Sequence, residues 1–137
     1  MIDITALDRD LTEIVVKRNE IADLDYNDER YDELEEALHD LEDDFQEKYG
    51  EYLEDALDDV HEKLNLTSDV LHPVAYVAKK YKQMETGQWL PYEGGVPVEL
   101  EEAEEAKIKL VMVPQPTRLV LVVGQGALRD VWVARKS

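Results

Sequence analysis

The sequence predicts an α+β protein in which an N-terminal, acidic, antiparallel helical hairpin packs with a small C-terminal antiparallel β-sheet. In the first half, apolar residues recur every three or four positions, as on one face of a helix, and after Val96 they alternate with polar residues, as in strands. The charge divides the chain in a similar way. Residues 1–66 hold 24 Asp and Glu against 6 Lys and Arg, whereas residues 67–137 hold 9 of each kind. We therefore expect an acidic hairpin over 1–66 and a sheet region over 67–137 that share one core.

The first helix is expected over about residues 3–22, because its apolar residues are spaced to lie on one side of a helix. They are Leu7, Leu11, Ile14, Val15 and Ile21. After a short acidic segment, the second helix is expected to begin at Asp28. Asn27 is the expected N-cap, since its side chain can accept a hydrogen bond from a free amide of the first turn. Tyr26 and Tyr31 stand at the positions of a hydrophobic staple.

The second helix is expected to run from residue 28 to residue 64, and its apolar stripe keeps the helical spacing throughout. The stripe consists of Leu34, Leu38, Leu41, Phe45, Tyr49, Leu53, Ala56, Val60 and Leu64. Gly50 lies inside this pattern, where a glycine costs about 1 kcal/mol relative to alanine and could end the helix. Because the apolar spacing continues beyond Gly50, we favour one continuous helix over two.

The second helix is too long for the first helix to cover. At about 1.5 Å per residue, residues 28–64 span about 55 Å and the first helix spans about 30 Å. The apolar residues beyond the reach of the first helix need another cover. They are Tyr52, Leu53, Ala56, Leu57, Val60 and Leu64. We expect both the C-terminal half and a second copy of the chain to contact them, which makes these residues a candidate interface of a homo-oligomer.

The C-terminal half is expected to consist mostly of strands. Between Val96 and Met112, seven apolar residues share one parity, although glutamates interrupt the middle. This pattern fits a hairpin or one long strand, and a short helix over 99–106 is the alternative because Glu and Ala favour helices. Residues 118–135 are expected to form another hairpin with its turn at 124–126. The first strand of that hairpin, RLVLVV, is apolar enough to be a buried central strand.

The segment that follows the second helix is ambiguous. Residues 74–84 have apolar spacings that suit a helix and β-branched residues that suit a strand, and we favour the strand. Glycines and prolines then punctuate residues 87–97. We expect Trp89 and Tyr92 to lie on a loop in that region.

The acidic segment between the helices matches the start of a calcium-binding loop. Asp23, Asp25 and Asn27 alternate as the first three ligands of such a loop do. The loop also needs a glycine where Asp28 stands and a bidentate glutamate where Leu34 stands. We therefore predict an acidic bend without a metal ion.

Two acid-x-x-His pairs have the spacing found in di-iron helical bundles. They are Glu36-x-x-His39 and Asp58-x-x-His61. The pairs are separated by about 33 Å along one helix, so they cannot form one site within a chain, although an antiparallel dimer could bring them together. We interpret these residues as solvent-exposed.

The sequence predicts no catalytic, cofactor-binding or metal-binding residue. Gly124-x-Gly126 is followed by too few residues for a dinucleotide-binding βαβ unit, so we interpret it as a hairpin turn. His72 is expected to be partly buried because it lies among apolar residues. Together with Trp89 and Tyr92, it is a candidate for a pocket between the sheet and the helices.

The composition narrows the classes of function. The net charge of −18 arises in the first half, where it repels phosphate and argues against direct binding of nucleic acid. No apolar run approaches the roughly 20 residues that cross a bilayer, and no signal-peptide pattern is evident at the N-terminus. The chain has no cysteine. These features predict a cytoplasmic protein that makes no use of a membrane.

Three functions fit these expectations, and a protein that is not an enzyme is favoured. The first is an interaction or assembly protein that associates with itself through its second helix. The second is an acidic decoy or adaptor for a basic protein partner, including a mimic of nucleic acid. The third is a small-molecule-binding or enzymatic site between the sheet and the helices.

Overall fold

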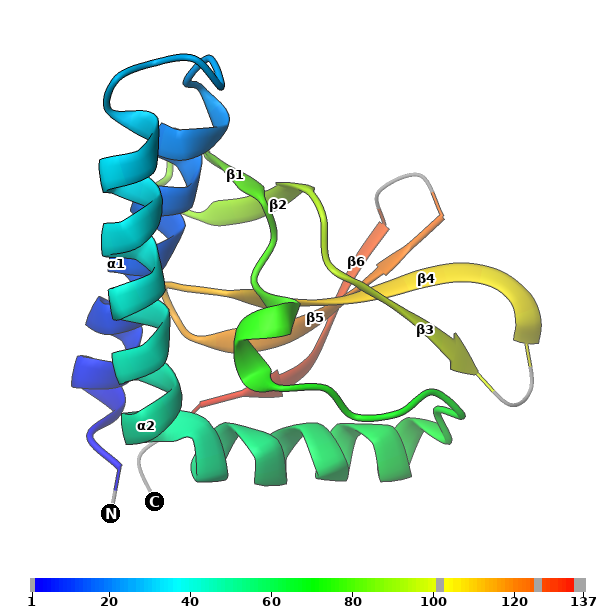
Figure 1. Cartoon of the computed structure of the whole chain (residues 1–137). Coiled ribbons are helices and arrows are strands. Elements are labelled where there is room, and N and C mark those ends of the chain that lie inside the picture. The colour runs from blue at the N-terminus through cyan, green and yellow to red at the C-terminus, as the bar shows by residue number, and fades with distance from the viewer. Residues whose placement is uncertain (1, 101–102, 125–126, 135–137) are drawn as a thin grey trace.

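The computed structural model describes residues 2–100, 103–124 and 127–134, and it has the predicted α+β architecture. Helices α1 and α2 lie side by side, and a two-stranded and a four-stranded antiparallel sheet accompany them (Figure 1). The helical elements are α1 (Ile4–Ala22), α2 (Tyr31–Leu64) and the 3₁₀ turn η1 (Pro73–Tyr76). The strands are β1 (Lys80–Gln83), β2 (Trp89–Glu93), β3 (Val96–Leu100), β4 (Ala103–Val113), β5 (Arg118–Val123) and β6 (Ala127–Val133).

Helix α1 has the predicted extent. Asp3 caps it, because the Asp3 Oδ1 accepts a hydrogen bond of 3.1 Å from the Ala6 amide and so satisfies a free donor of the first turn. The buried side of α1 is the predicted apolar stripe. Its fully buried residues are Leu7, Leu11, Ile14 and Val15.

Helix α2 begins at Tyr31, so the predicted start at Asp28 with Asn27 as N-cap is wrong. The Asp28 Oδ1 accepts a hydrogen bond of 2.9 Å from the Arg30 amide, and the Asp28 carbonyl accepts one of 3.0 Å from the Tyr31 amide. These local bonds form a turn that competes with the helix. Hydrogen bonding to Arg30 also lowers the pKa of Asp28. The predicted contact of Tyr26 with Tyr31 is present, with 5.3 Å between the ring centroids.

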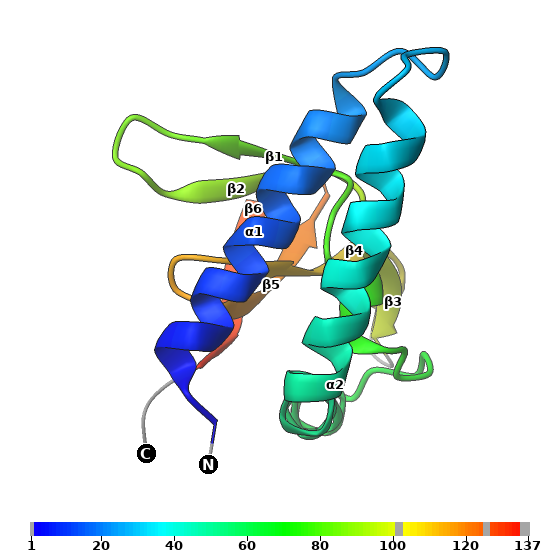
Figure 2. The ribbon, with the colours of Figure 1, turned by 60° about the vertical axis from the view of Figure 1, so that its left-hand side comes forward.

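Helix α2 continues across Gly50, as predicted, but it is not straight. Figure 1 shows the first half of α2 running beside α1 and the second half turning sharply away, and Figure 2 shows that second half end-on. The bend lies in the middle part of α2, where the colour passes from teal to green. The bend carries the second half of α2 along the strands instead of beyond them.

The four-stranded sheet is a meander in the order β3-β4-β5-β6, with every neighbouring pair antiparallel. Strands β3 and β4 pair as a hairpin, so the predicted alternatives of one long strand and of a helix over 99–106 are wrong for the described residues; residues 101–102 lie outside them. The predicted second hairpin is β5–β6, although residues 125–126 of its turn also lie outside the described residues. RLVLVV is a central strand, and because residues 118–121 are all buried, both faces of β5 are covered at this end.

The ambiguous residues 74–84 adopt both kinds of structure that their sequence suggested. The 3₁₀ turn η1 comes first, and strand β1 then pairs with β2. Strand β2 contains Trp89 and Tyr92, so the prediction of a loop there is wrong. Pro91 is tolerated within β2 because each strand of a two-stranded sheet is an edge strand, where a missing amide donor need not break the ladder.

The sheet region covers the part of α2 that α1 does not reach. Of the six apolar residues in this part of α2, four are buried, and the other two, Tyr52 and Leu64, are half-buried against the core. The Tyr52 ring meets the Trp132 ring of β6 edge-on, with 5.8 Å between the centroids. One cluster of buried residues includes side chains of both helices and of both sheets.

Polar side chains of α1 join the hairpin to the sheet region. The Arg18 Nη1 donates a hydrogen bond of 2.6 Å to the Val77 carbonyl, and the Arg18 Nη2 lies 3.0 Å from the Glu42 Oε2 of α2. The Asn19 side chain pairs with the backbone of Tyr81 in β1, accepting from its amide at 2.8 Å and donating to its carbonyl at 3.1 Å. Arg18 and Asn19 therefore bond α1 to α2, to the segment between η1 and β1, and to β1 itself.

Candidate functional site

A row of acidic residues follows the solvent-facing side of α2 along its whole length. Nine Asp and Glu residues succeed one another at steps of three or four positions, so they share one side of the helix. All nine are exposed. We call this set the acidic stripe, and its members are Asp32, Glu36, Asp40, Asp43, Glu47, Glu51, Asp55, Asp58 and Glu62.

Helix α2 carries little positive charge of its own. It contains 15 Asp and Glu residues but only 2 lysines, Lys48 and Lys63, and no arginine. Like charges at these spacings each destabilise a helix by about 0.2–0.5 kcal/mol, so the eight steps of the acidic stripe cost about 2–4 kcal/mol in total. Packing of the opposite side of α2 offsets this cost. A cationic partner placed on the stripe would relieve part of the repulsion.

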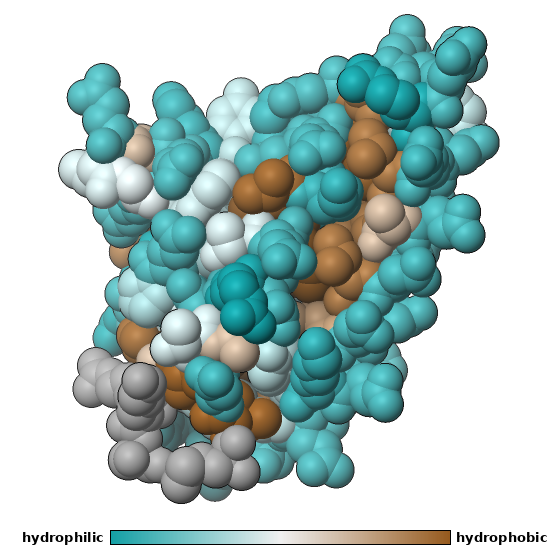
Figure 3. All heavy atoms as spheres, turned by 90° about the vertical axis from the view of Figure 1, so that its left-hand side faces the viewer, coloured by the Kyte–Doolittle hydropathy of each residue, from teal (hydrophilic) through white to brown (hydrophobic). Residues whose placement is uncertain are grey.

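An apolar groove lies between α1 and α2. Figure 3 shows apolar residues gathered between the two helices and bordered by polar ones. The groove has a volume of about 530 Å³. Its apolar lining consists of Val16, Ala37 and Leu41, and Val16 is 42% exposed. We call this feature the hairpin groove.

Both edges of the hairpin groove are acidic. Glu13 and Glu20 line it from α1, and Asp40 and Asp44 line it from α2. All four carboxylates belong to exposed residues. Lys17 also lines the groove, where its Nζ lies 3.8 Å from the Glu20 Oε2. The edges therefore carry a net negative charge, and because Asp40 belongs to the acidic stripe, the groove and the stripe adjoin each other.

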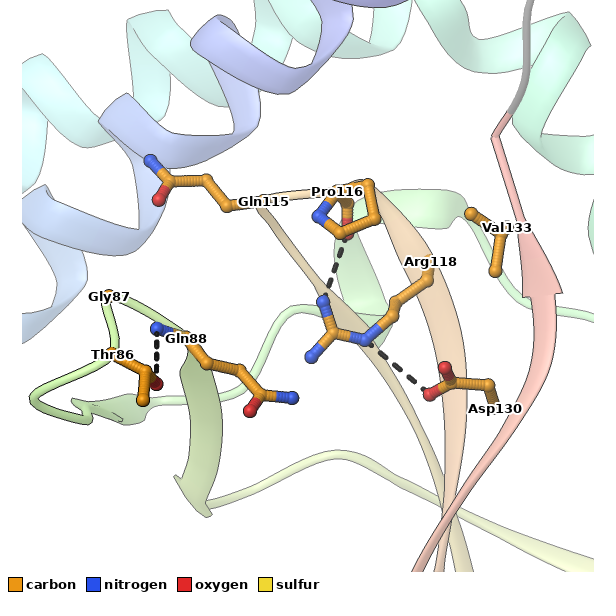
Figure 4. A pocket seen from close by; sticks show the side chains of 8 residues that line it. All are labelled: Thr86, Gly87, Gln88, Gln115, Pro116, Arg118, Asp130 and Val133. Carbon is orange, nitrogen blue, oxygen red and sulfur yellow. Dashed lines mark hydrogen bonds and ion pairs between the residues drawn. The ribbon is translucent and has the colours of Figure 1, made fainter.

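Arg118 lines a second cavity, also of about 530 Å³ (Figure 4). The Arg118 Nη1 donates to the carbonyls of Pro114 and Pro116 at 3.2 and 3.1 Å, and the Nη2 donates to the Trp89 carbonyl at 3.3 Å. The Arg118 Nε lies 3.5 Å from the Asp130 Oδ1. These oxygens occupy most of the guanidinium donors. Because they belong to different segments, Arg118 links β2, the turn before β5, and β6. The role of this buried arginine is therefore structural.

The three residues predicted to line a pocket differ in their exposure. Trp89 is buried in the core, whereas Tyr92 is 69% exposed, with the Lys80 Nζ 5.9 Å from its ring centroid. His72 is exposed, so the prediction that it is partly buried is wrong; its Nδ1 lies 3.8 Å from the Glu54 Oε1. The reason is that the segment leading into η1 crosses the surface, where residues 69–72 are all exposed.

The acidic bend and the histidine pairs form no metal centre in the part of the chain that the structure describes, where no group of three or more potential His, Asp or Glu ligands is found. Asp23, the first residue of the calcium-loop pattern, instead lies 2.9 Å from the Lys80 Nζ. His39 is exposed, as predicted. His61 is buried, contrary to the prediction, because it adjoins the apolar stripe of α2, and its Nδ1 lies 2.9 Å from the Leu57 carbonyl.

The residues predicted as an oligomer interface lie within the packing of one chain. Leu53 and Leu57 are completely buried, and Ala56 and Val60 are nearly so. The observation that motivated self-association was an apolar stripe without a cover, and the chain supplies that cover itself.

Sequence reasoning missed the hairpin groove and the two linking arginines. Val16 offered a signal, because Ile14, Val15 and Val16 are consecutive and span about 200° around a helix, so they cannot all face the core. Arg18 and Arg118 offered none. Six of their eight partners are backbone carbonyls, which leave no pattern in the residue types, and four of these carbonyls belong to segments distant in sequence.

Comparisons with protein-family models, with curated proteins and with solved structures find no match to this chain. Within the described ranges, no helix is long and apolar enough to cross a membrane. The surfaces described above are therefore the basis for assigning a function.

Proposed function

We propose that this protein binds a basic protein partner through the acidic, solvent-facing side of α2. The observation that carries the proposal is the acidic stripe, nine exposed carboxylates that follow one side of one helix without interruption. Such a row presents a negative potential along the whole helix. The partner that complements it displays Lys and Arg, as do proteins that otherwise bind nucleic acid. We place this interaction in the cytoplasm, which a cysteine-free chain suits.

The physical effect of the acidic stripe is to speed and select association. Complementary charges raise the rate of encounter and disfavour partners of the wrong sign. Each exposed ion pair is worth only about 0.2–1 kcal/mol, so binding depends on several pairs acting together. An interface of this kind weakens as salt is added, because the Debye length falls from about 30 Å at 0.01 M to about 8 Å at 0.15 M.

The test compares two variants that remove the same charge from different surfaces. The stripe variant combines Asp43→Asn, Glu47→Gln and Glu51→Gln. The control variant combines Asp69→Asn, Glu85→Gln and Glu99→Gln, which are exposed residues outside α2. Both variants change the net charge by the same amount, so a difference between them reports the position of the charge. The probe is a fluorescent lysine-rich peptide, and its affinity is measured by anisotropy over a salt series.

We expect the stripe variant to bind the probe about tenfold more weakly than the wild type, since three lost pairs at about 0.5 kcal/mol each sum to about 1.5 kcal/mol. The control variant should lose less than about twofold on the same scale. Equal losses in the two variants would show that net charge, and not the stripe, attracts the probe. Binding that does not weaken with salt would also contradict the proposal.

A further inference from the structure

We propose that the hairpin groove receives an amphipathic helix of the partner, with the apolar side of that helix between α1 and α2 and with Lys or Arg along both of its flanks. This inference rests on the proposed function, because it specifies the form in which a basic partner binds. It adds an apolar contact to a surface that charge alone would leave without a fixed orientation.

Apolar residues are exposed where α1 and α2 meet. Val16 is 42% exposed although its neighbours Ile14 and Val15 are buried. Leu41 and Ala37 face it from α2 and are only half-buried. A groove between two packed helices accepts the side-chain ridge of a third helix, which is a common mode of peptide recognition.

The hairpin groove is long enough to hold two turns of a helix. Its lining extends from Glu13 to Glu20 on α1 and from Ala37 to Asp44 on α2. Each of these stretches covers about 10 Å at about 1.5 Å per residue, which is two helical turns. A partner helix presents apolar residues at i, i+3, i+4 and i+7 over the same distance, so one such set matches the apolar lining of the groove.

The charge on the edges of the groove decides between possible occupants. Carboxylates stand on both edges, Glu13 and Glu20 on one and Asp40 and Asp44 on the other. A second copy of the chain that docked symmetrically would bring these same acidic edges together, and like charges across an interface oppose association. A helix with basic flanks places opposite charges against both edges. The groove is therefore complementary to a basic helix and not to another copy of this protein.

The experiment uses three peptides and two variants of the full chain. One peptide is a Lys/Leu sequence with leucines at helical spacing, the second is its scrambled form with the same composition, and the third replaces every Lys by Glu. The groove variant is Val16→Glu. The matched control is Val123→Glu, since Val123 lies on β5 and is 40% exposed, almost the same as Val16. Far-UV circular dichroism and thermal melting confirm that both variants fold.

The groove variant separates apolar contact from charge. Val16→Glu adds a negative charge, which by itself strengthens attraction to a basic peptide, so weaker binding can only follow from the lost apolar lining. We expect the amphipathic Lys/Leu peptide to bind the wild type at least about tenfold more tightly than its scrambled form, and Val16→Glu to abolish that preference. Val123→Glu should retain it.

Each other outcome overturns the inference in a distinguishable way. Equal binding of the amphipathic and scrambled basic peptides would reject the groove but leave the acidic stripe as a binding surface. Failure of both basic peptides to bind would reject the inference and the proposed function together. Binding of the Glu/Leu peptide as tight as that of the Lys/Leu peptide would reject a basic partner. A dimer in light scattering that Val16→Glu dissociates would identify a second copy as the occupant.

Discussion

Replacing Leu53 by alanine tests whether the sheet region covers the second half of α2. Leu53 is completely buried in the cluster that joins the helices to the strands. Truncating such a leucine removes buried methyl groups and leaves a cavity, which together cost about 2–5 kcal/mol. At about 2.1 cal/mol/K of unfolding entropy per residue, a chain of this length has an unfolding entropy near 0.29 kcal/mol/K, so a loss of about 3 kcal/mol lowers the Tm by about 10 °C.

The assay is thermal unfolding followed by circular dichroism at several protein concentrations. Glu51→Ala is the matched control, because Glu51 is exposed on the same stretch of α2 and surface substitutions usually change stability by less than about 0.5 kcal/mol. If Leu53 faced a second copy and not the sheet, the Tm would depend on protein concentration. The packing described here would be refuted if Leu53→Ala lowered the Tm by less than about 3 °C, or if the Tm rose with protein concentration.

Three further predictions concern polar and charged groups. Arg18→Met leaves the Val77 carbonyl and the Glu42 carboxylate without their donor, so chemical denaturation should show a loss of about 2–4 kcal/mol, whereas the exposed Arg9→Met should lose less than about 0.5 kcal/mol. Burial, followed by the hydrogen bond to Asp10, raises the pKa of Tyr49 to about 12. Because an unfolded tyrosine loses its proton near about pH 10, protonated Tyr49 stabilises the fold fully below that pH, and this stabilisation disappears as the pH rises through about 12. The free energy of unfolding of Tyr49→Phe should therefore decline less steeply with pH over this range than that of the wild type. Parallel curves for the two proteins would contradict the assignment. Raising the salt from about 0.01 M to about 0.15 M should increase the Tm by screening the acidic stripe, and a decrease would show that attractive pairs dominate instead.

The elements that follow a strong apolar period were predictable from the sequence. Five of the nine residues in the predicted apolar stripe of α2 are buried, including Phe45 and Leu53, because apolar spacing reflects the side of a helix that packs on the core. The other four are half-buried: Leu34, Leu38, Leu41 and Leu64. The sharp bend of α2 was not predictable, since a bent helix and a straight helix keep the same spacing of apolar residues. For that reason the sequence suggested an uncovered stripe, whereas the bend places it against the chain's own strands.

Local competition explains the errors at element boundaries. Asp28 is a reasonable first-turn residue of a helix, yet its side chain bonds to the Arg30 amide and delays the helix to Tyr31. Pro91 argued for a loop, although an edge strand accepts it. The candidate site was predictable in part. The acidic side of α2 is evident in the sequence, whereas the hairpin groove depends on which faces of two helices meet.

Chemical-shift mapping with the ¹⁵N-labelled protein and the amphipathic Lys/Leu peptide tests the central claim most directly, because it locates the bound peptide on the fold. We expect the amide signals of residues 13–20 in α1 and 37–44 in α2 to shift and saturate together, while those of β5 and β6 stay in place. Shifts that spread evenly over every exposed carboxylate, or that centre on the strands, would contradict a basic partner bound to the acidic helical hairpin.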